Sequence, residues 1–560
     1  MNAAIACFGG LLAFFLGFRF FANYLAKKVY KVDIHAPVPS HTLEDGMDYV
    51  PTNKFVLFGH HFATIAGAAP IIGPALAVIW GWVPALLWVV LGTIAWGGAH
   101  DFGALILSVR NKGKSIGEIA KGMIGPKAMT AYMVIIFFIL VLVMAVFLLV
   151  VSGLLIQYPE AVFPVFALML IAICIGTLIY RTGVGITPAT IVGIGLMILS
   201  IWWGSGHPYP MPEQTFLGSA QTTWVCLLAL YSFAASVLPV WLLLQPRDYL
   251  ESFNLYGGLT LVYLGIFVTA PTFAAPAIRT DVPGAPPMWP FLFITIACGA
   301  LSGFHSIVSS GTSPKQLNSE ADAKFVGYGG MIGEGALGLA AVITCTAGFA
   351  TRELWMDHYA TWSGAAGLSH KLSAFVDGAA YFISHFAIPL QMGKTIIVLI
   401  IISFAMTSLD SACRLGRYIV SELGEEHRVH VFKNRFLASG VVAGIAFIFA
   451  MGTYGGKSAG LILWPLFGTT NQLLASLVFA IITIYLLQRK CPTWPTTIPM
   501  VLVSVTTIAA MIWNIQGYIR DGNWLLTVVG GIILVAGFVL VVLSAKAYIR
   551  ERRARSAVKL

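Results

Sequence analysis

The stretch FVLFGHHFATIAGAAPIIGPALAVI, from Phe55 to Ile79, is long and apolar enough to cross a bilayer as a helix. Its middle nevertheless carries Gly67, Pro70, Gly73 and Pro74. Because proline removes a backbone donor and glycine weakens a helix, we expect this segment to be unwound or kinked there. Non-helical backbone persists at bilayer depth only beside protein groups or a water-filled cavity, and transporters bind substrates and ions at such breaks. The stretch therefore predicts a transport site around Gly67 and Pro70.

The composition around this stretch is that of an all-α polytopic membrane protein. The 560 residues are 58% hydrophobic and only 10% charged, whereas a soluble domain has about 25% charged residues. The net charge of +10 does not predict a nucleic-acid partner, because the basic residues fall in short loops, as the positive-inside rule requires. The seven cysteines include no CxxC pair, so we expect neither a disulfide framework nor a zinc site.

Apolar segments of spanning length recur along the whole chain. We expect about 15 transmembrane helices, at residues 3–24, 54–79, 83–108, 129–156, 161–180, 186–203, 221–244, 256–275, 290–310, 327–349, 394–414, 434–453, 459–487, 497–516 and 524–548. With the N-terminus outside, alternation places most lysines and arginines in the inner loops and the basic tail in the cytoplasm.

One outer segment is unusually long for this chain, about forty residues from Ala350 to Gly393. Its stretch 371–390 is apolar but too charged to span easily. It is either a re-entrant or surface-lying helix that acts as a lid, or an ordinary amphipathic loop helix.

Ionisable side chains inside spans are costly and indicate function. His60 and His61 lie beside the predicted break, and Asp101 and Glu334 lie at a similar depth in their own spans. These four are candidates for contact with a proton or a substrate, since opposite charges at matching depth can pair and histidine titrates near neutral pH.

Two further ionisable side chains have a structural alternative. His305 could relay protons or simply bond a neighbouring helix. Asp410 could take part in transport or form a salt bridge with Arg414, one turn later on the same helix.

A second break is predicted in span 221–244, at Ser236 and Pro239. Spans 54–79 and 221–244 would run in opposite directions, five elements apart. That spacing is expected of a five-plus-five inverted repeat whose halves each begin with a broken helix.

Hydroxyl side chains end two inward-running spans and supply hard oxygen ligands. Ser309, Ser310 and Thr312, or Thr407 and Ser408, form a candidate Na⁺ site, with interhelical hydrogen bonding as the alternative. Span 459–487 contains consecutive polar residues 469–472, and Asn471 is included among the candidate substrate contacts.

Long motifs of this chain resemble the carbon starvation protein A family of bacterial inner-membrane transporters. The matching stretches run from about Tyr49 to about Ala475: YVPTNKFVLFGHHFATIAGAAPIIGP, WGGAHDFGALILSVRNKGKSIGEIA, LQPRDYL, SGFHSIVSSGTSPKQLNSEADAKFVGYGGMIGEG, FAMTSLDSACRLGRYIV and LWPLFGTTNQLLA. The resemblance implies an energised importer of peptides or pyruvate with a core of the LeuT-type inverted repeat. It also divides the chain into an N-terminal family region at 1–375, a C-terminal family region at 376–515, and a last span with a basic tail at 516–560.

These observations together predict a secondary transporter of the bacterial inner membrane rather than an enzyme. The substrate would be pyruvate, another small carboxylate or a short peptide, driven by H⁺ or, second, by Na⁺. We expect no cofactor, and the partners are the small-molecule substrate and the lipid bilayer. The alternative is a nutrient sensor that binds without net transport.

Overall fold

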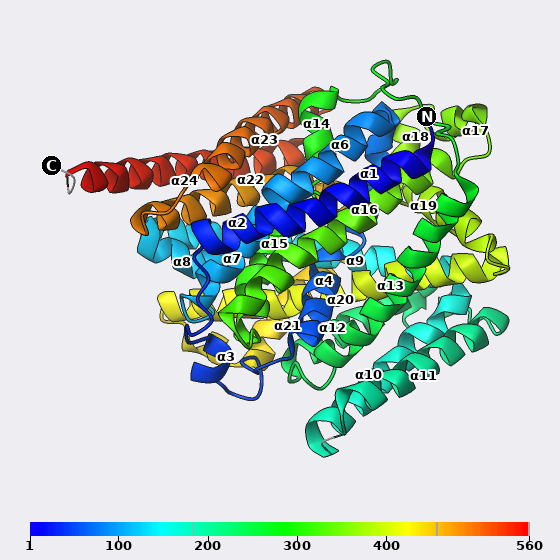
Figure 1. Cartoon of the computed structure of the whole chain (residues 1–560), viewed down its shortest axis with the longest axis horizontal. Helices are drawn as coiled ribbons and strands as arrows, with labels where there is room; N and C mark the ends of the chain where they lie inside the picture. Colours follow the sequence, from blue (N-terminus) through cyan, green and yellow to red (C-terminus); the bar gives the residue numbers. More distant parts are fainter. Residues whose placement is uncertain (183, 455–456, 558–560) are drawn as a thin grey trace.

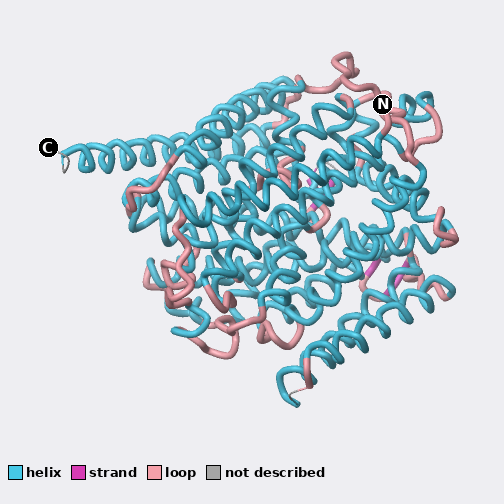
Figure 2. The backbone as a smooth tube through the Cα atoms, in the orientation of Figure 1, coloured by secondary structure: helices cyan, strands magenta, loops and turns pink. Residues whose placement is uncertain are grey.

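The computed structural model describes residues 1–182, 184–454 and 457–557. Almost all of the described chain is helical (Figures 1 and 2). The strands form two small antiparallel hairpins, β1 (Gln214–Thr215) with β2 (Gly218–Ser219) and β3 (Thr453–Tyr454) with β4 (Lys457–Ser458). The prediction of an all-α membrane architecture is therefore confirmed.

Among the described residues, 12 helical segments are long and apolar enough to cross a membrane. They contain α1 (Ala3–Leu16) and α2 (Ala22–Tyr24), α6 (Trp82–Gly92) and α7 (Gly98–Val109), α9 (Pro126–Gln157), α10 (Val162–Thr182), α11 (Ile186–Gly206), α12 (Ala220–Val237), α13 (Leu244–Thr269), α16 (Gly329–Ala347), α20 (Leu390–Glu426), α22 (Ala459–Gln488), α23 (Trp494–Arg520) and α24 (Trp524–Ala557).

Three predicted spans take other forms. Span 54–79 is the pair α4 (Lys54–Ala66) and α5 (Ala69–Ala77), bent by 44°. Span 290–310 is the pair α14 (Met288–Thr295) and α15 (Gly303–Gly311), separated by irregular backbone. Span 434–453 is α21 (Arg435–Met451), which has 17 residues. The number of membrane crossings stays a prediction.

Shorter helices mark the two ends of the bundle. One end of the bundle, which we call the α3 end, holds α3 (Pro39–Thr42) and α8 (Ile116–Met123). The opposite end, which we call the α17 end, holds α17 (Arg352–His358), α18 (Trp362–Ala365) and the N-terminus (Figure 1). The stretch predicted as a lid falls mainly on α19 (Leu368–Ser384), a continuous helix that packs against α5, α13, α16 and α20.

Two long helices, α9 and α20, pack against each other in the interior of the bundle. α9 is apolar around most of its circumference, as expected of a helix enclosed on all sides. α22 is buried beside them. These helices form the rigid centre that the two broken helix pairs contact.

The predicted break at Ser236 and Pro239 is wrong. α12 ends at Val237, and Pro239 lies in the connection to α13, where the helix has already stopped. Leu238, the residue before the proline, has the extended backbone that proline imposes on its predecessor. The second interruption is instead the segment 296–302, between α14 and α15.

Candidate functional site

The first break lies at Gly67, in the middle of the bundle. α4 begins at the cap residue Asn53, whose side chain accepts a hydrogen bond from the amide of Phe55. It ends at Gly67, which has a φ of +51°, a conformation that glycine adopts without steric cost. α5 then starts with Pro70 in its first turn, where a proline sacrifices no helical bond. The prediction of a break in this stretch is confirmed.

At the second break, side chains bond the irregular backbone. Glu334 Oε1 accepts a hydrogen bond of 3.0 Å from the amide of Gly299, and Asn471 Oδ1 accepts one of 2.7 Å from the amide of Phe304. The side-chain nitrogen of Asn471, Nδ2, also donates to Ser302 Oγ. Polar side chains from α16 and α22 thus stabilise open backbone that lipid could not.

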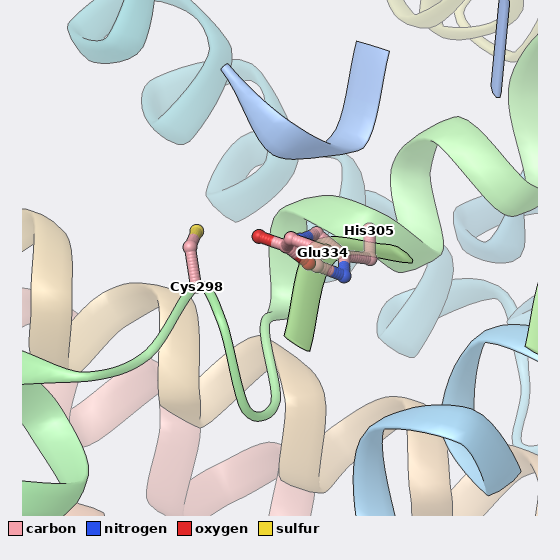
Figure 3. A group of neighbouring side chains, drawn as sticks. All are labelled: Cys298, His305 and Glu334. Atoms are coloured by element: carbon pink, nitrogen blue, oxygen red, sulfur yellow. Dashed lines mark ion pairs between the residues drawn. The ribbon is translucent and has the colours of Figure 1, made fainter. Parts of the chain in front are cut away.

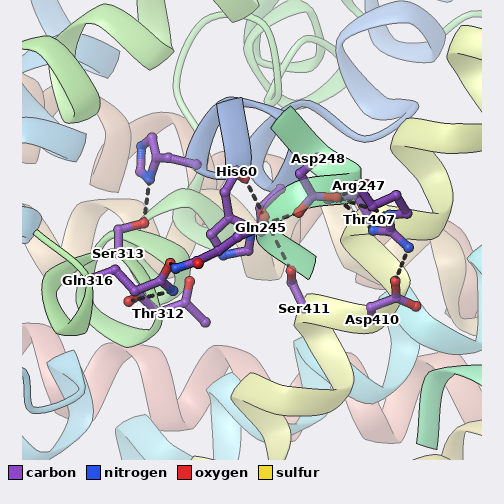
Figure 4. Close-up of polar contacts among 12 residues, drawn as sticks. His60, Gln245, Arg247, Asp248, Thr312, Ser313, Gln316, Thr407, Asp410 and Ser411 are labelled. Carbon is purple, nitrogen blue, oxygen red and sulfur yellow. Dashed lines mark hydrogen bonds and ion pairs between the residues drawn. The ribbon is translucent and has the colours of Figure 1, made fainter. Parts of the chain in front are cut away.

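Beside the first break lies a buried group of charges, the Arg247 cluster, made of His60, Arg247, Asp248, Thr407 and Asp410 (Figure 4). His60 Nδ1 lies 2.6 Å from Asp248 Oδ2. Arg247 donates to Asp248 Oδ1 at 2.8 Å and to Thr407 Oγ1 at 2.8 Å, and it also pairs with Asp410. The cluster joins α4, α13 and α20.

Beside the second break lies the His305 cluster, made of His100, Asp101, His305 and Glu334, all fully buried. His305 Nδ1 is 2.9 Å from Asp101 Oδ2, and His305 Nε2 is 3.1 Å from Glu334 Oε2. The other carboxylate oxygen of Asp101 is 2.8 Å from His100 Nδ1. A chain of titratable groups therefore runs from α7 through α15 to α16.

The His305 cluster also offers donor atoms for a metal. Cys298, His305 and Glu334 each place one such atom within 4.8 Å of the others (Figure 3). Sulfur, imidazole and carboxylate donors suit a transition-metal ion. In the structure the Cys298 thiol donates instead to Ser302 Oγ at 3.3 Å.

His305 thus bridges Asp101 and Glu334. The two adjacent histidines have different partners: His60 contacts Asp248, and His61 contacts Ser313. His61 Nδ1 lies 2.7 Å from Ser313 Oγ, at the end of α15. Ser236 bonds back to the carbonyl oxygen of Phe233 on its own helix and belongs to neither cluster.

The five hydroxyls of the candidate Na⁺ site bond to different groups. Ser310 accepts from the amide of Ile116, and Ser408 donates to the carbonyl oxygen of Thr64. Thr407 accepts from Arg247, which places a positive charge beside it. Ser309 and Thr312 are buried, and neither hydroxyl has a hydrogen-bond partner among the described residues.

Sequence reasoning missed Arg247 and Asp248 as site residues. They stand in the motif LQPRDYL near the start of α13, just after the connection at Pro239. Two adjacent opposite charges at the start of an apolar helix were a signal, but they read equally well as a surface pair. The proposed salt bridge of Asp410 with Arg414 is also wrong, since Asp410 pairs with Arg247 while Arg414 pairs with Asp48.

A cavity of about 560 Å³ reaches the breaks from the α17 end. Its lining includes Ala69, Gly73, Thr295 and Cys298, which belong to or flank both broken helices. A larger hollow of about 830 Å³ lies among residues 29–43 and the ends of α7 and α22, and none of the predicted site residues lines it. The smaller cavity is therefore the one that the broken helices share.

The chain matches the sequence profile described as "Carbon starvation protein CstA" over residues 2–357 and 356–510. The chain belongs to this family. It is 33% identical to "Peptide transporter CstA" of Bacillus subtilis over 98% of this chain and 97% of that protein. It is 32% identical to "Pyruvate/proton symporter BtsT" of Escherichia coli over 89% of this chain and 80% of that protein.

Family membership makes this chain a multi-pass membrane protein of a transporter family rather than an enzyme. Among solved structures, a manganese transporter of Eremococcus coleocola aligns with 91% of this chain and 99% of its own, at 12% identity and a TM-score of 0.43. That likeness is too distant to indicate a cargo.

Proposed function

We propose that this chain is a cation-coupled secondary transporter that imports a small carboxylate or a short peptide across the bacterial inner membrane. The observation that carries the proposal is that two interrupted helices, α4/α5 and α14/α15, line one cavity, which reaches their breaks from the α17 end. Interrupted helices are where transporters bind substrate and coupling ion. Relatives named for peptides and for pyruvate with a proton point to the same class of cargo.

The charge balance of the two clusters favours coupling to a cation. With neutral histidines, the Arg247 cluster holds Asp248 and Asp410 against a single arginine, and the His305 cluster holds Asp101 and Glu334 against no cation. Uncompensated charge is costly to bury. One proton on His60 or His305 reduces that excess at either break, so H⁺ is the coupling ion we favour and Na⁺ the second choice.

The order of elements supports the LeuT-type inverted repeat, with its second half beginning later than the sequence suggested. α4/α5 runs from the α3 end to the α17 end, and α14/α15 runs in the opposite direction. Each pair is followed by a spanning helix, then by one or more short helices, and then by a long buried helix. These are α6–α7, α8 and α9 in the first half, and α16, α17–α19 and α20 in the second. In this proposal the α17 end is periplasmic and the basic α3 end is cytoplasmic.

Uptake by the purified chain in proteoliposomes tests this function. Labelled pyruvate and labelled dialanine are offered under an imposed pH gradient, an imposed Na⁺ gradient, or neither. We expect accumulation of at least one substrate with the pH gradient. Binding without accumulation would instead indicate a sensor, and accumulation with Na⁺ alone would refute proton coupling.

Variants of the His305 cluster test the coupling step separately from folding. Asp101→Asn and Glu334→Gln should abolish gradient-driven accumulation and preserve substrate exchange at equal pH, because the exchange needs binding but no net proton movement. The imidazole of His61 bonds Ser313 and belongs to neither cluster. His61→Ala should therefore retain more coupling than Asp101→Asn. Asp521→Asn, an exposed acid at the α17 end, is the control. Full coupling in both cluster variants would refute the assignment.

A further inference from the structure

The cavity shared by the two breaks is lined mainly by apolar residues. Aromatic side chains line much of it, among them Phe147, Trp362, Trp464 and Trp513. Of the described residues that line it, Lys371 is the one with a charged side chain. A mostly apolar hollow with a single placed charge is the usual form of a site for a small ligand.

Lys371 has no counter-charge in the described structure. It lies near the start of α19, and no ion pair or hydrogen bond of its ammonium group is found among the described residues. Lys394 differs from Lys371 in this respect, because its Nζ lies 2.7 Å from Oδ1 of Asp377, a residue of α19. Burial lowers the pKa of Lys371 to about 8, so the side chain still carries its charge at neutral pH. Lys371 is partly exposed, so an anion that enters the cavity meets an ammonium group for which no carboxylate of the described lining competes.

The cavity also lacks what a zwitterion needs. A dipeptide has a carboxylate and an ammonium group, whereas no aspartate or glutamate is found among the described residues of the lining. An organic acid with one carboxylate and no amine satisfies Lys371 and leaves its remaining atoms against the aromatic wall.

We propose that Lys371 binds the carboxylate of a monocarboxylic acid in this cavity, and that the site selects such acids over zwitterionic peptides. This inference rests on the proposed function and narrows its substrate class. Lys371 would be a specificity-determining residue at the periplasmic approach to the two breaks, on the path to Cys298 and the His305 cluster behind it.

Uptake kinetics of the full chain in proteoliposomes test the inference. The variants are Lys371→Gln, Lys371→Met, which keeps the apolar stem, and Lys371→Arg. Lys394→Gln is the matched control at the same end of the bundle. The loss of a hydrogen bond to a charged group should raise the KM for pyruvate about 10- to 100-fold in the Gln and Met variants. Lys371→Arg should restore most of the affinity, and the KM for dialanine should be little changed.

A binding measurement separates this inference from the proposed function. Trp362, Trp464 and Trp513 line the cavity, so pyruvate binding should change the tryptophan fluorescence saturably in the parent chain and in Lys371→Arg, but not in Lys371→Met. If pyruvate binds in this pattern and no accumulation occurs, the inference holds and the transport function fails. Parent-like KM and binding in Lys371→Gln and Lys371→Met would overturn the inference while leaving transport intact. An equal rise in the KM for dialanine in the Gln and Met variants would overturn the proposed selectivity for monocarboxylic acids.

Discussion

Arg247 is the residue on which the polar interior depends most. Its guanidinium group is 3% exposed and lies between Asp248 and Asp410, which are both fully buried. It also contacts Thr407 of α20. One side chain of α13 therefore compensates two carboxylates from different helices, and this arrangement makes its loss more costly than that of a surface arginine.

Replacing Arg247 should destabilise the protein strongly. We expect Arg247→Met to lower the free energy of unfolding by about 3–5 kcal/mol, because it leaves two buried carboxylates without their cation. Adding Asp410→Asn should recover part of the loss. Thermal unfolding in detergent micelles measures both effects, and the exposed Arg520→Met is the control. Parent-like stability of Arg247→Met would show that the cluster is balanced by other means.

At the scale of elements, the broken helices approach their neighbours through backbone. A Cβ atom on Gly67 would lie 2.6 Å from Ser408 Oγ, and one on Gly73 would lie 2.5 Å from the carbonyl oxygen of Thr295. α5 therefore contacts the end of α14 directly, which brings the two breaks together. The glycines of the quoted stretch serve this close packing as well as the break itself.

Gly67→Ala tests the geometry of the first break. The backbone of Gly67, with a φ of +51° and a ψ of −148°, lies in a region that is essentially restricted to glycine and costs another residue about 1–3 kcal/mol. The contact with Ser408 adds to that cost. We expect Gly67→Ala to reduce stability and uptake. Ser408→Ala in the same chain should remove the contact with the hydroxyl, and leave the backbone cost and the closer approach to Phe147. Gly257→Ala, at a helical position of α13 where a Cβ meets nothing within 4 Å, should be neutral or slightly stabilising. An equal effect at both glycines would contradict the steric explanation.

At the scale of the whole molecule, the two ends differ. The cavity reaches the breaks from the α17 end, whereas at the opposite end a loop around Asp48 joins several helices. Asp48 pairs with Arg414 and Arg417 of α20. The neighbouring Met47 accepts through its carbonyl oxygen from the amide of Val240, and Val50 donates through its amide to the carbonyl oxygen of Lys315. The loop thereby ties α20 to the α12–α13 connection and to the segment that follows α15.

Asp48 should make the stability of the folded protein depend on pH. Burial alone would raise the pKa of Asp48, but Arg414, Arg417 and Lys315 together hold it well below its ordinary value. The ionised carboxylate therefore stabilises the folded state above its unfolded pKa of about 4, and this contribution disappears as the pH falls towards the folded pKa. We expect Asp48→Asn to lower stability by about 1.5–3 kcal/mol at pH 7.

Thermal unfolding of Asp48→Asn and the parent chain across pH checks this sign. The difference between them should be constant above about pH 5 and should shrink below about pH 4. Glu44→Gln, an exposed acid in the same loop, should show no such difference. A gap that widens on acidification would refute the assignment.

The membrane architecture and the first break could be predicted from the residues of each segment alone. Apolar length, scarce charge and the Gly–Pro pattern of 67–74 act locally, through hydrogen bonds within one segment, so they can be read without knowing the neighbours. The same local reasoning identified His60, Asp101, His305 and Glu334 as costly to bury and therefore informative.

Which of these groups meet depends on how the helices pack, and it could not be predicted from the sequence. Asp410 left its helical neighbour Arg414 for Arg247, and Pro239 proved to lie in a connection while the segment 296–302 opened the second helix. Lys371, in the first turn of α19, lines the cavity at the two breaks. Pairing and cavity lining depend on how helices far apart in the chain pack together, and the spacing of residues within one segment carries no information about that.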